Sequence, residues 1–165
     1  MFYFLDVDGV LNRESDWRIP FTVNEECLKN FVMLIKKDSD PHIVLSSTWR
    51  VGFTNTGVMS SGGNSLADKL AAYGIRIEAF TPVSNKTRQE EIEFYIRRNN
   101  VTEYLVLDDD ASLFPWPERL HLYLTDYKTG LTDKDIRKIY RLCKQRRQTR
   151  CIVQKRHSVK VSLQH

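Results

Sequence analysis

Five short apolar runs, each four to six residues long, constrain the fold of this 165-residue chain more than any other feature. A continuous apolar run of this length is typical of a strand buried on both faces of a parallel sheet. Amphipathic helical patterns separate the runs, and strands that alternate with helices indicate βαβ units with right-handed crossovers. The sequence therefore predicts an α/β fold with a central parallel five-stranded sheet flanked by helices, its strands lying at Met1–Asp6, His42–Leu45, Ile75–Phe80, Tyr104–Leu107 and Leu120–Leu124.

Capping residues mark the helices expected between these strands. Asn24 can cap a helix that carries apolar residues up to Ile35, and Gly74 suits the position just after a helix over 64–73. A third helix is expected over 86–99, and Thr132 can cap a fourth over 133–147. These elements predict one domain over residues 1–147, followed by a basic tail, 148–165, that is either an added strand or disordered.

Polar side chains gather where the predicted strands end. In open α/β sheets, ligands bind outside the carboxyl ends of the strands. Carboxylates that meet there repel one another, and a hard cation such as Mg²⁺ relieves the repulsion. A carboxylate can also attack phosphorus directly, while a second acid moves the proton of the leaving group. The residues that the sequence places at this edge are Asp6, Asp8, Ser46, Lys86, Asp108, Asp109 and Asp110.

Four segments resemble, in this chain order, the motifs of the haloacid dehalogenase-like (HAD) superfamily: FYFLDVDGVL, HIVLSS, SNKTRQEE and YLVLDDD. The resemblance implies the Rossmann-like HAD fold and a Mg²⁺-dependent phosphomonoester hydrolase that acts through an aspartyl-phosphate. It implies that Asp6 is the nucleophile, Asp8 the general acid/base, Ser46 the phosphate-binding hydroxyl, Lys86 the charge clamp, and Asp109 with Asp108 the Mg²⁺ ligands beside Asp6 and the Asp8 carbonyl. The role of Asp110 is left open.

The acid at position 8 narrows the chemistry within the superfamily. The P-type ATPases carry Thr at this position and the dehalogenases lack an acid there, so Asp8 resembles the phosphatase and phosphotransferase branch. The segments LDVDGVLN, LSSTWR, NKTRQEEI, LVLDDD and LTDYKTGLT are also similar to the small HAD domains associated with Swiss Army Knife RNA-repair proteins.

Three further residues are expected to contact the substrate, namely Gly9, Ser47 and Arg50. Arg50 follows the second motif closely and could hold a phosphate with two parallel hydrogen bonds, the alternative being a surface ion pair. If Lys86 is not the charge clamp, Arg50 and Arg88 are the next candidates. Asn12 and Trp49 accompany the same motifs, with a turn and core packing as their simpler interpretations.

The spacing of the motifs leaves no room for an inserted cap domain. The 37 residues between Asp8 and Ser46 are consumed by a flap and one helix, and the 39 between Ser46 and Lys86 hold one short helix, the Gly/Ser loop and one strand. An open site admits a phosphate on a large molecule, such as an RNA or DNA end, with the Gly/Ser-rich loop 52–65 as a partial lid. The alternatives are a phosphatase of a phosphoprotein or small metabolite, a catalytically silent binding module, and a receiver-like signalling domain.

Composition excludes several other classes of protein. The apolar runs are too short to span a bilayer, and the N-terminus lacks the features of a secretory signal, so no membrane partner is expected.

Three cysteines at irregular spacing fit a cytoplasmic protein without disulfides or a Cys-rich zinc site. Residues 137–165 carry 10 of the 25 Lys and Arg and no acid, a pattern common in chains that contact polyanions, the alternative being a solvated helix face with a disordered end. The oligomeric state is left open.

Overall fold

The computed structural model describes residues 1–51 and 61–145, apart from the side chains of 61–65. Five strands form one parallel sheet in the order β3-β2-β1-β4-β5. This confirms the predicted fold class, and each strand begins and ends within two residues of its predicted limits. The strands are β1 (Phe2–Leu5), β2 (His42–Leu45), β3 (Ile77–Phe80), β4 (Tyr104–Asp108) and β5 (Leu122–Leu124).

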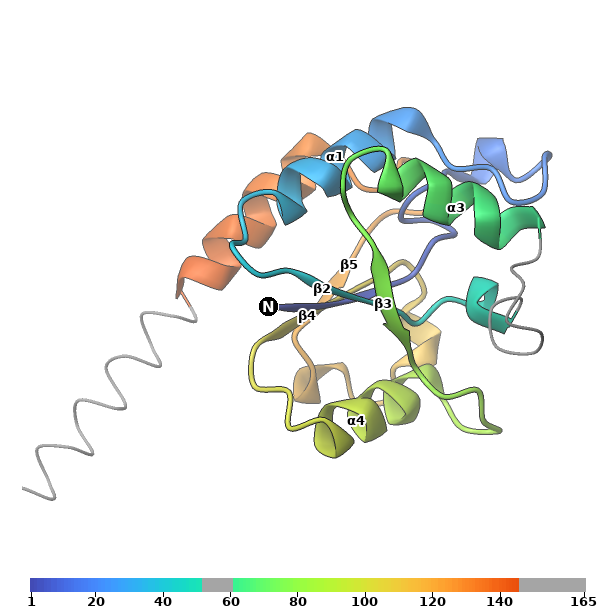
Figure 1. Cartoon of the computed structure of the whole chain (residues 1–165). Coiled ribbons are helices and arrows are strands. Elements are labelled where there is room, and N and C mark those ends of the chain that lie inside the picture. The colour runs from blue at the N-terminus through green and yellow to red at the C-terminus, as the bar shows by residue number, and fades with distance from the viewer. Residues whose placement is uncertain (52–60, 146–165) are drawn as a thin grey trace, which may run out of the picture. The chain divides into compact units, whose positions relative to one another are not determined.

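Helices cover both faces of the sheet, α1 (Glu25–Ile35) and α3 (Ser61–Ala71) on one side and α4 (Arg88–Arg98) on the other (Figure 1). Alternate residues of a strand point to opposite faces. Phe4, Val44 and Val106 therefore share the face toward α4, where they pack in one cluster with Ile92. Because both faces are buried, the middle residues of the central strands are apolar.

The helix α1 follows its predicted cap, whereas the cap of α4 was not predicted. The side chain of Asn24 accepts hydrogen bonds from the backbone of Glu26 and Cys27 at the start of α1. Thr87 caps α4 by accepting from the backbone N–H of Glu90, and α3 starts three residues before its predicted limit. Four 3-10 turns lie between these elements in the described ranges: η1 (Glu14–Asp16), η2 (Thr48–Arg50), η3 (Ala111–Leu113) and η4 (Pro117–Arg119).

The chain divides into two compact units, Met1–Thr132 and Asp133–His165, and the first contains the whole sheet. In the second unit, residues 133–145 form the helix predicted after Thr132. The predicted tail over 148–165 and most of the predicted loop over 52–65 lie outside the described residues. The part of the chain that is described contains no cap domain, and no helix in it is long and apolar enough to cross a membrane.

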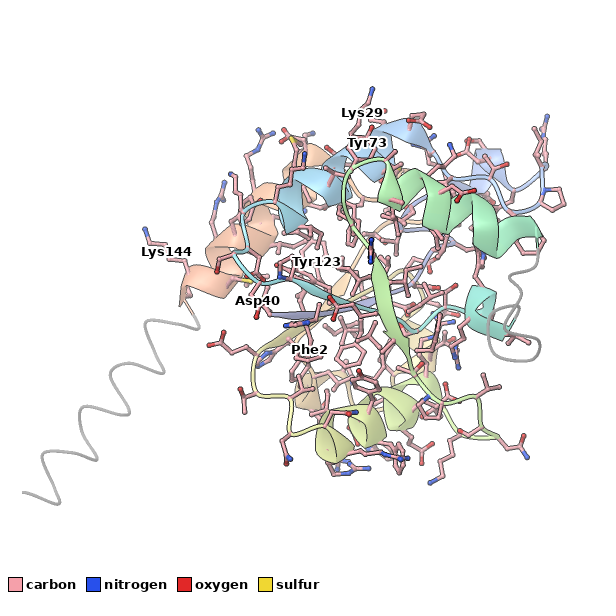
Figure 2. All side chains as sticks on the ribbon, viewed as in Figure 1. Phe2, Lys29, Asp40, Tyr73, Tyr123 and Lys144 are labelled. Atoms are coloured by element: carbon pink, nitrogen blue, oxygen red, sulfur yellow. The ribbon has the colours of Figure 1, made fainter. Side chains whose placement is uncertain are left out.

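At the amino-terminal edge of the sheet, the start of the chain contacts the segment that leads into β2. The N-terminal ammonium donates a 2.7 Å hydrogen bond to the carbonyl of Asp40 and lies 3.1 Å from the Asp38 carboxylate. Phe2, labelled beside Asp40 in Figure 2, stacks on His42 with ring centroids 4.7 Å apart.

We expect Asn24→Ala to lower the free energy of unfolding by about 1 kcal/mol, because two backbone donors at the start of α1 lose their acceptor. Chemical denaturation measures the change, and Asn24→Ser, which keeps a capping oxygen, should recover most of it. An alanine variant as stable as the wild type would contradict the capping geometry.

Candidate active site

The pairing register of three strands brings the first predicted residues together. Leu5 at the end of β1 is paired with Leu45 of β2 and with Leu107 of β4. The following residues continue the ladder, since Asp6 N donates to the Leu107 carbonyl and Ser46 N donates to the Leu5 carbonyl, both at 2.9 Å. Asp6, Ser46 and Asp108 therefore form one row across the carboxyl edge of the sheet.

Three carboxylates of this edge form a tight group, which we call the carboxylate cluster: Asp6, Asp108 and Asp109. Each offers an oxygen within 4.8 Å of the others. Asp6 is 5% exposed, Asp108 is fully buried and Asp109 is half-buried. Three carboxylate oxygens at this spacing are the hard donors that Mg²⁺ prefers, so the donor set fits that ion.

Gly9 makes room for this cluster. Its φ is +69°, and a Cβ at this position would lie 2.2 Å from Asp109 Oδ2. Any other residue would both strain the backbone and displace the Asp109 carboxylate. The carbonyl of Gly9 also accepts a 2.8 Å hydrogen bond from the hydroxyl of Thr125. Gly9, predicted as a substrate contact, thus acts in the structure by letting Asp109 approach β1.

Crowding and burial raise the pKa of two members of the carboxylate cluster. Burial, followed by the charge of Asp6, raises the pKa of Asp108 to about 7, against the opposing effect of Arg88. The same two causes raise the pKa of Asp109 to about 6. Both shifts reflect the cost of holding several negative charges in one dehydrated space.

Arg88 offsets part of that cost. It is the first residue of α4, and its Nη1 donates to Asp6 Oδ2 at 2.5 Å and to Asp108 Oδ2 at 2.7 Å. Burial works to lower the pKa of the Arg88 guanidinium, but the two carboxylates outweigh it and the pKa is raised. Arg88 is therefore a permanent positive charge between the acids that end β1 and β4.

Lys86, predicted as the charge clamp, lies two residues before this arginine and is exposed. Its backbone N–H donates to Ser84 Oγ at 3.2 Å. Its ammonium contributes to the lowered pKa of Glu90 and forms no ion pair with the residues that the structure describes. The structure thus brings Arg88, and not Lys86, into contact with the carboxylate cluster.

Asp8 stands apart from the carboxylate cluster and is held by two side-chain donors. Asn12 Nδ2 donates to its Oδ1 at 2.8 Å, and Trp49 Nε1 donates to its Oδ2 at 2.9 Å. Asn12 also accepts from the backbone of Gly9 and from the indole of Trp17, both at 2.9 Å. These contacts fix the orientation of the Asp8 carboxyl while leaving it half-buried beside the row.

The segment after β2 combines an unpaired hydroxyl with a buried arginine. The Ser46 hydroxyl is fully buried and has no hydrogen-bond partner among the described residues. Ser47 caps η2, accepting from Trp49 N at 3.4 Å. Arg50, predicted as a phosphate contact, is 5% exposed, and it donates to the carbonyls of Ser46 (2.5 Å) and Ser47 (2.8 Å) and to Glu91 (2.5 Å). The buried guanidinium of Arg50 thus stabilises the segment after β2 through these hydrogen bonds.

Several of these roles were not evident from the sequence. Arg88 was only a substitute for Lys86, while Trp49 and Asn12 had simpler interpretations as core packing and a turn. A signal for Arg88 exists, since Thr87 is a good N-cap and makes the next side chain the first of the helix. Asp110, whose role was open, caps η3 by accepting from the backbone and hydroxyl of Ser112, at 2.9 and 2.6 Å.

The raised pKa of Asp108 predicts an unusual dependence of stability on pH. The folded chain keeps this proton up to about pH 7, whereas an unfolded carboxyl loses it near its ordinary pKa, so stability falls as the pH rises from about 4 through 7. In the presence of a chelator, the Tm of the wild type should fall between pH 5 and pH 8 by roughly 2–4 °C more than that of Asp108→Asn.

Thermal melts at both pH values measure this difference, and Asp110→Asn is the matched control. Ser112 lowers the pKa of Asp110, so the contribution of Asp110 to stability is lost as the pH falls and its removal cannot mimic the effect. Parallel curves for the wild type and Asp108→Asn would contradict the account.

Comparison with known proteins adds one independent finding. Residues 2–136 match the family described as the HAD domain in Swiss Army Knife RNA repair proteins. No curated protein and no solved structure matches the chain. The matched range contains the sheet, the carboxylate cluster, Ser46 and Arg88. The chain therefore belongs to this family of HAD domains, within the HAD superfamily.

Proposed function

We propose that the chain is a Mg²⁺-dependent phosphomonoester hydrolase that acts through an aspartyl-phosphate on Asp6. The observation that carries the proposal is the row of Asp6, Ser46 and Asp108 at the carboxyl edge of the sheet, with Arg88 bonded to both acids. It combines a nucleophile, a free hydroxyl and a fixed positive charge in one place, as phosphoryl transfer requires.

The carboxylates of Asp6, Asp108 and Asp109, with the backbone carbonyl of Asp8, would hold the ion. When bound, Mg²⁺ supplies positive charge against the phosphoryl oxygens and relieves the repulsion within the carboxylate cluster. The close approach of Asp109 to Gly9 supports this role.

In the first step, a carboxylate oxygen of Asp6 attacks phosphorus, and the bond from phosphorus to the leaving oxygen breaks. Asp8 gives its proton to that oxygen, so an alcohol leaves. Val7 N donates to Asp6 Oδ1 at 2.9 Å and Arg88 to Oδ2, which fixes the rotamer of the nucleophile. The hydroxyl of Ser46 is available to donate to a phosphoryl oxygen.

In the second step, Asp8 takes a proton from water, and the water oxygen attacks phosphorus. The bond between phosphorus and Asp6 breaks, inorganic phosphate leaves, and both aspartates return to their starting forms. Asn12 and Trp49 hold the two oxygens of Asp8 through the cycle, which keeps the carboxyl aimed for proton transfer in both directions.

For the substrate, we propose a phosphate at the end of an RNA or DNA strand. Two observations support this choice, namely the family's association with RNA repair and the lack of a cap domain in the described part of the chain. A screen with Mg²⁺ of oligonucleotides bearing 3′- or 5′-phosphates, a phosphopeptide and small phosphomonoesters tests it. Release from none of them would favour a silent binding module instead.

Asp6→Asn should abolish release of phosphate, and Asp8→Asn should reduce the steady-state rate by at least about 100-fold, because an amide cannot take a proton from water. Colorimetric phosphate release measures both, and circular dichroism checks that each variant is folded. Asp38→Asn, at the opposite edge of the sheet, is the control. Wild-type turnover by Asp8→Asn would overturn the assignment of the acid/base.

Alanine variants of two neighbouring basic residues, Arg88 and Lys86, test which of them acts as the charge clamp. Arg88→Ala should reduce kcat/KM by at least about 100-fold, because the buried acids lose their fixed compensating charge and a donor near the transferring group. Lys86→Ala should retain activity within about fivefold, as expected of an exposed side chain outside the carboxylate cluster. The reverse ranking would return the clamp to Lys86.

A further inference from the structure

Large apolar side chains are exposed in the segment between β1 and α1. Trp17 is 44% exposed and Phe21 is 46% exposed, and Tyr127, from the turn after β5, is 39% exposed. We call these three side chains the aromatic surface. An exposed group of large rings on a soluble domain indicates a contact with a partner or ligand.

The rings are held in fixed pairs. Trp17 stacks on Tyr127 with centroids 6.1 Å apart and planes 23° apart. Phe21 meets the buried ring of Trp49 edge-on, with centroids 5.2 Å apart. Such pairing holds the rings in place and spares a ligand the cost of ordering them.

Each ring pair is connected to Asp8 by hydrogen bonds, one pair directly and the other through Asn12. The indole of Trp49 donates to one oxygen of Asp8, and the indole of Trp17 reaches the other oxygen through Asn12. In the proposed reaction, Asp8 protonates the leaving oxygen. The organic part of the substrate extends from that oxygen, and these contacts hold the aromatic surface near Asp8.

The backbone of Phe21 adopts an unfavourable conformation. Its φ is +58°, a region that bulky residues rarely occupy. Asn12 Nδ2 donates to the carbonyl of Thr22 at 3.0 Å, and the Thr22 hydroxyl donates to the carbonyl of Ile19 at 2.8 Å, so the turn is held on both sides. Strain kept in place by such contacts is typical of functional positions.

Two cations flank the aromatic surface. Arg18 follows Trp17, and Lys128 lies with its Nζ 5.7 Å from the ring centroid of Tyr127. Both are exposed, and within the described ranges neither forms an ion pair. Rings that can stack on bases, together with cations that can meet backbone phosphates, are the recurring elements of single-strand binding sites.

We propose that the aromatic surface stacks on the terminal nucleobase of a phosphorylated nucleic-acid strand, with Arg18 and Lys128 toward the next phosphates. The inference rests on the proposed function, because it uses Asp8 as the proton donor to the leaving group. It adds a recognition element for the base, so the enzyme should distinguish a nucleotide end from an equally accessible phosphate that carries no base.

Two oligonucleotides test the proposal. They share the terminal phosphate that the wild type hydrolyses, and one carries a base at the terminal nucleotide while the other is abasic there. Phe21→Ala should raise KM for the first about 10-fold with kcat within about twofold, and should leave the abasic substrate within about twofold. Phe21→Tyr should restore the wild-type KM, and Phe94→Ala, whose ring is 45% exposed on α4, is the matched control.

Tyr127→Ala, which removes a ring that has no hydrogen bond to Asn12 or Asp8, repeats the test if Phe21→Ala does not fold. Trp17 is unsuitable alone, because its indole donates to Asn12 and its loss would also disturb Asp8. Equal effects of the ring variants on both substrates, or no effect on either, would overturn the proposal.

A binding measurement separates this inference from the proposed function. Fluorescence anisotropy with labelled forms of the two oligonucleotides and the Asp6→Asn protein requires no turnover. Weaker binding of the base-bearing strand by Asp6→Asn/Phe21→Ala than by Asp6→Asn supports the stacking site even if the wild type releases no phosphate. Activity on nucleic-acid ends with equal affinity for both strands keeps the proposed function and overturns the stacking site.

Discussion

Repulsion among buried carboxylates is the constraint on which the carboxyl edge of this sheet depends. Asp6, Asp108 and Asp109 present oxygens within 4.8 Å of one another. At an effective dielectric constant of about 20, each pair of charges at that distance costs roughly 3–4 kcal/mol. Arg88 relieves the deeper pair and leaves the cluster short of positive charge, as the raised pKa values of Asp108 and Asp109 reflect. A site in this condition is suited to a divalent cation.

Much of the fold could be predicted because local pattern and tertiary environment agree. The central strands are buried on both faces, so an unbroken apolar run such as His42–Leu45 coincides with the whole of β2. Asn24 could be recognised as the start of α1 because its side chain can accept hydrogen bonds from backbone donors. The same hydrogen bonds stabilise the helix in the structure. The order of the strands could not be read in this way, because every run is equally apolar and pairing depends on contacts distant in the sequence.

In the candidate site, too, some contacts could be predicted from local pattern, and others depend on residues distant in the sequence. The acids that end β1 and β4 could be placed together because parallel strands end at one edge. The contact of Arg88 with them depends on where α4 begins, and Thr87 as N-cap sets the following residue as its first. The hydrogen bond from Trp49 to Asp8 joins residues 41 positions apart, and nothing in the local pattern distinguishes this indole from a ring of the core.

The claim at the centre of this account is that Asp6 attacks phosphorus and carries the phosphoryl group. Mass spectrometry of the Asp8→Asn protein, quenched in acid after mixing with Mg²⁺ and a hydrolysable phosphorylated substrate, tests it most directly. The account predicts one added phosphoryl group on the peptide that contains Asp6, because the intermediate forms faster than it is hydrolysed. A wild-type enzyme that turns over while no phosphorylated Asp6 is trapped, or a phosphoryl group on another residue, would contradict it.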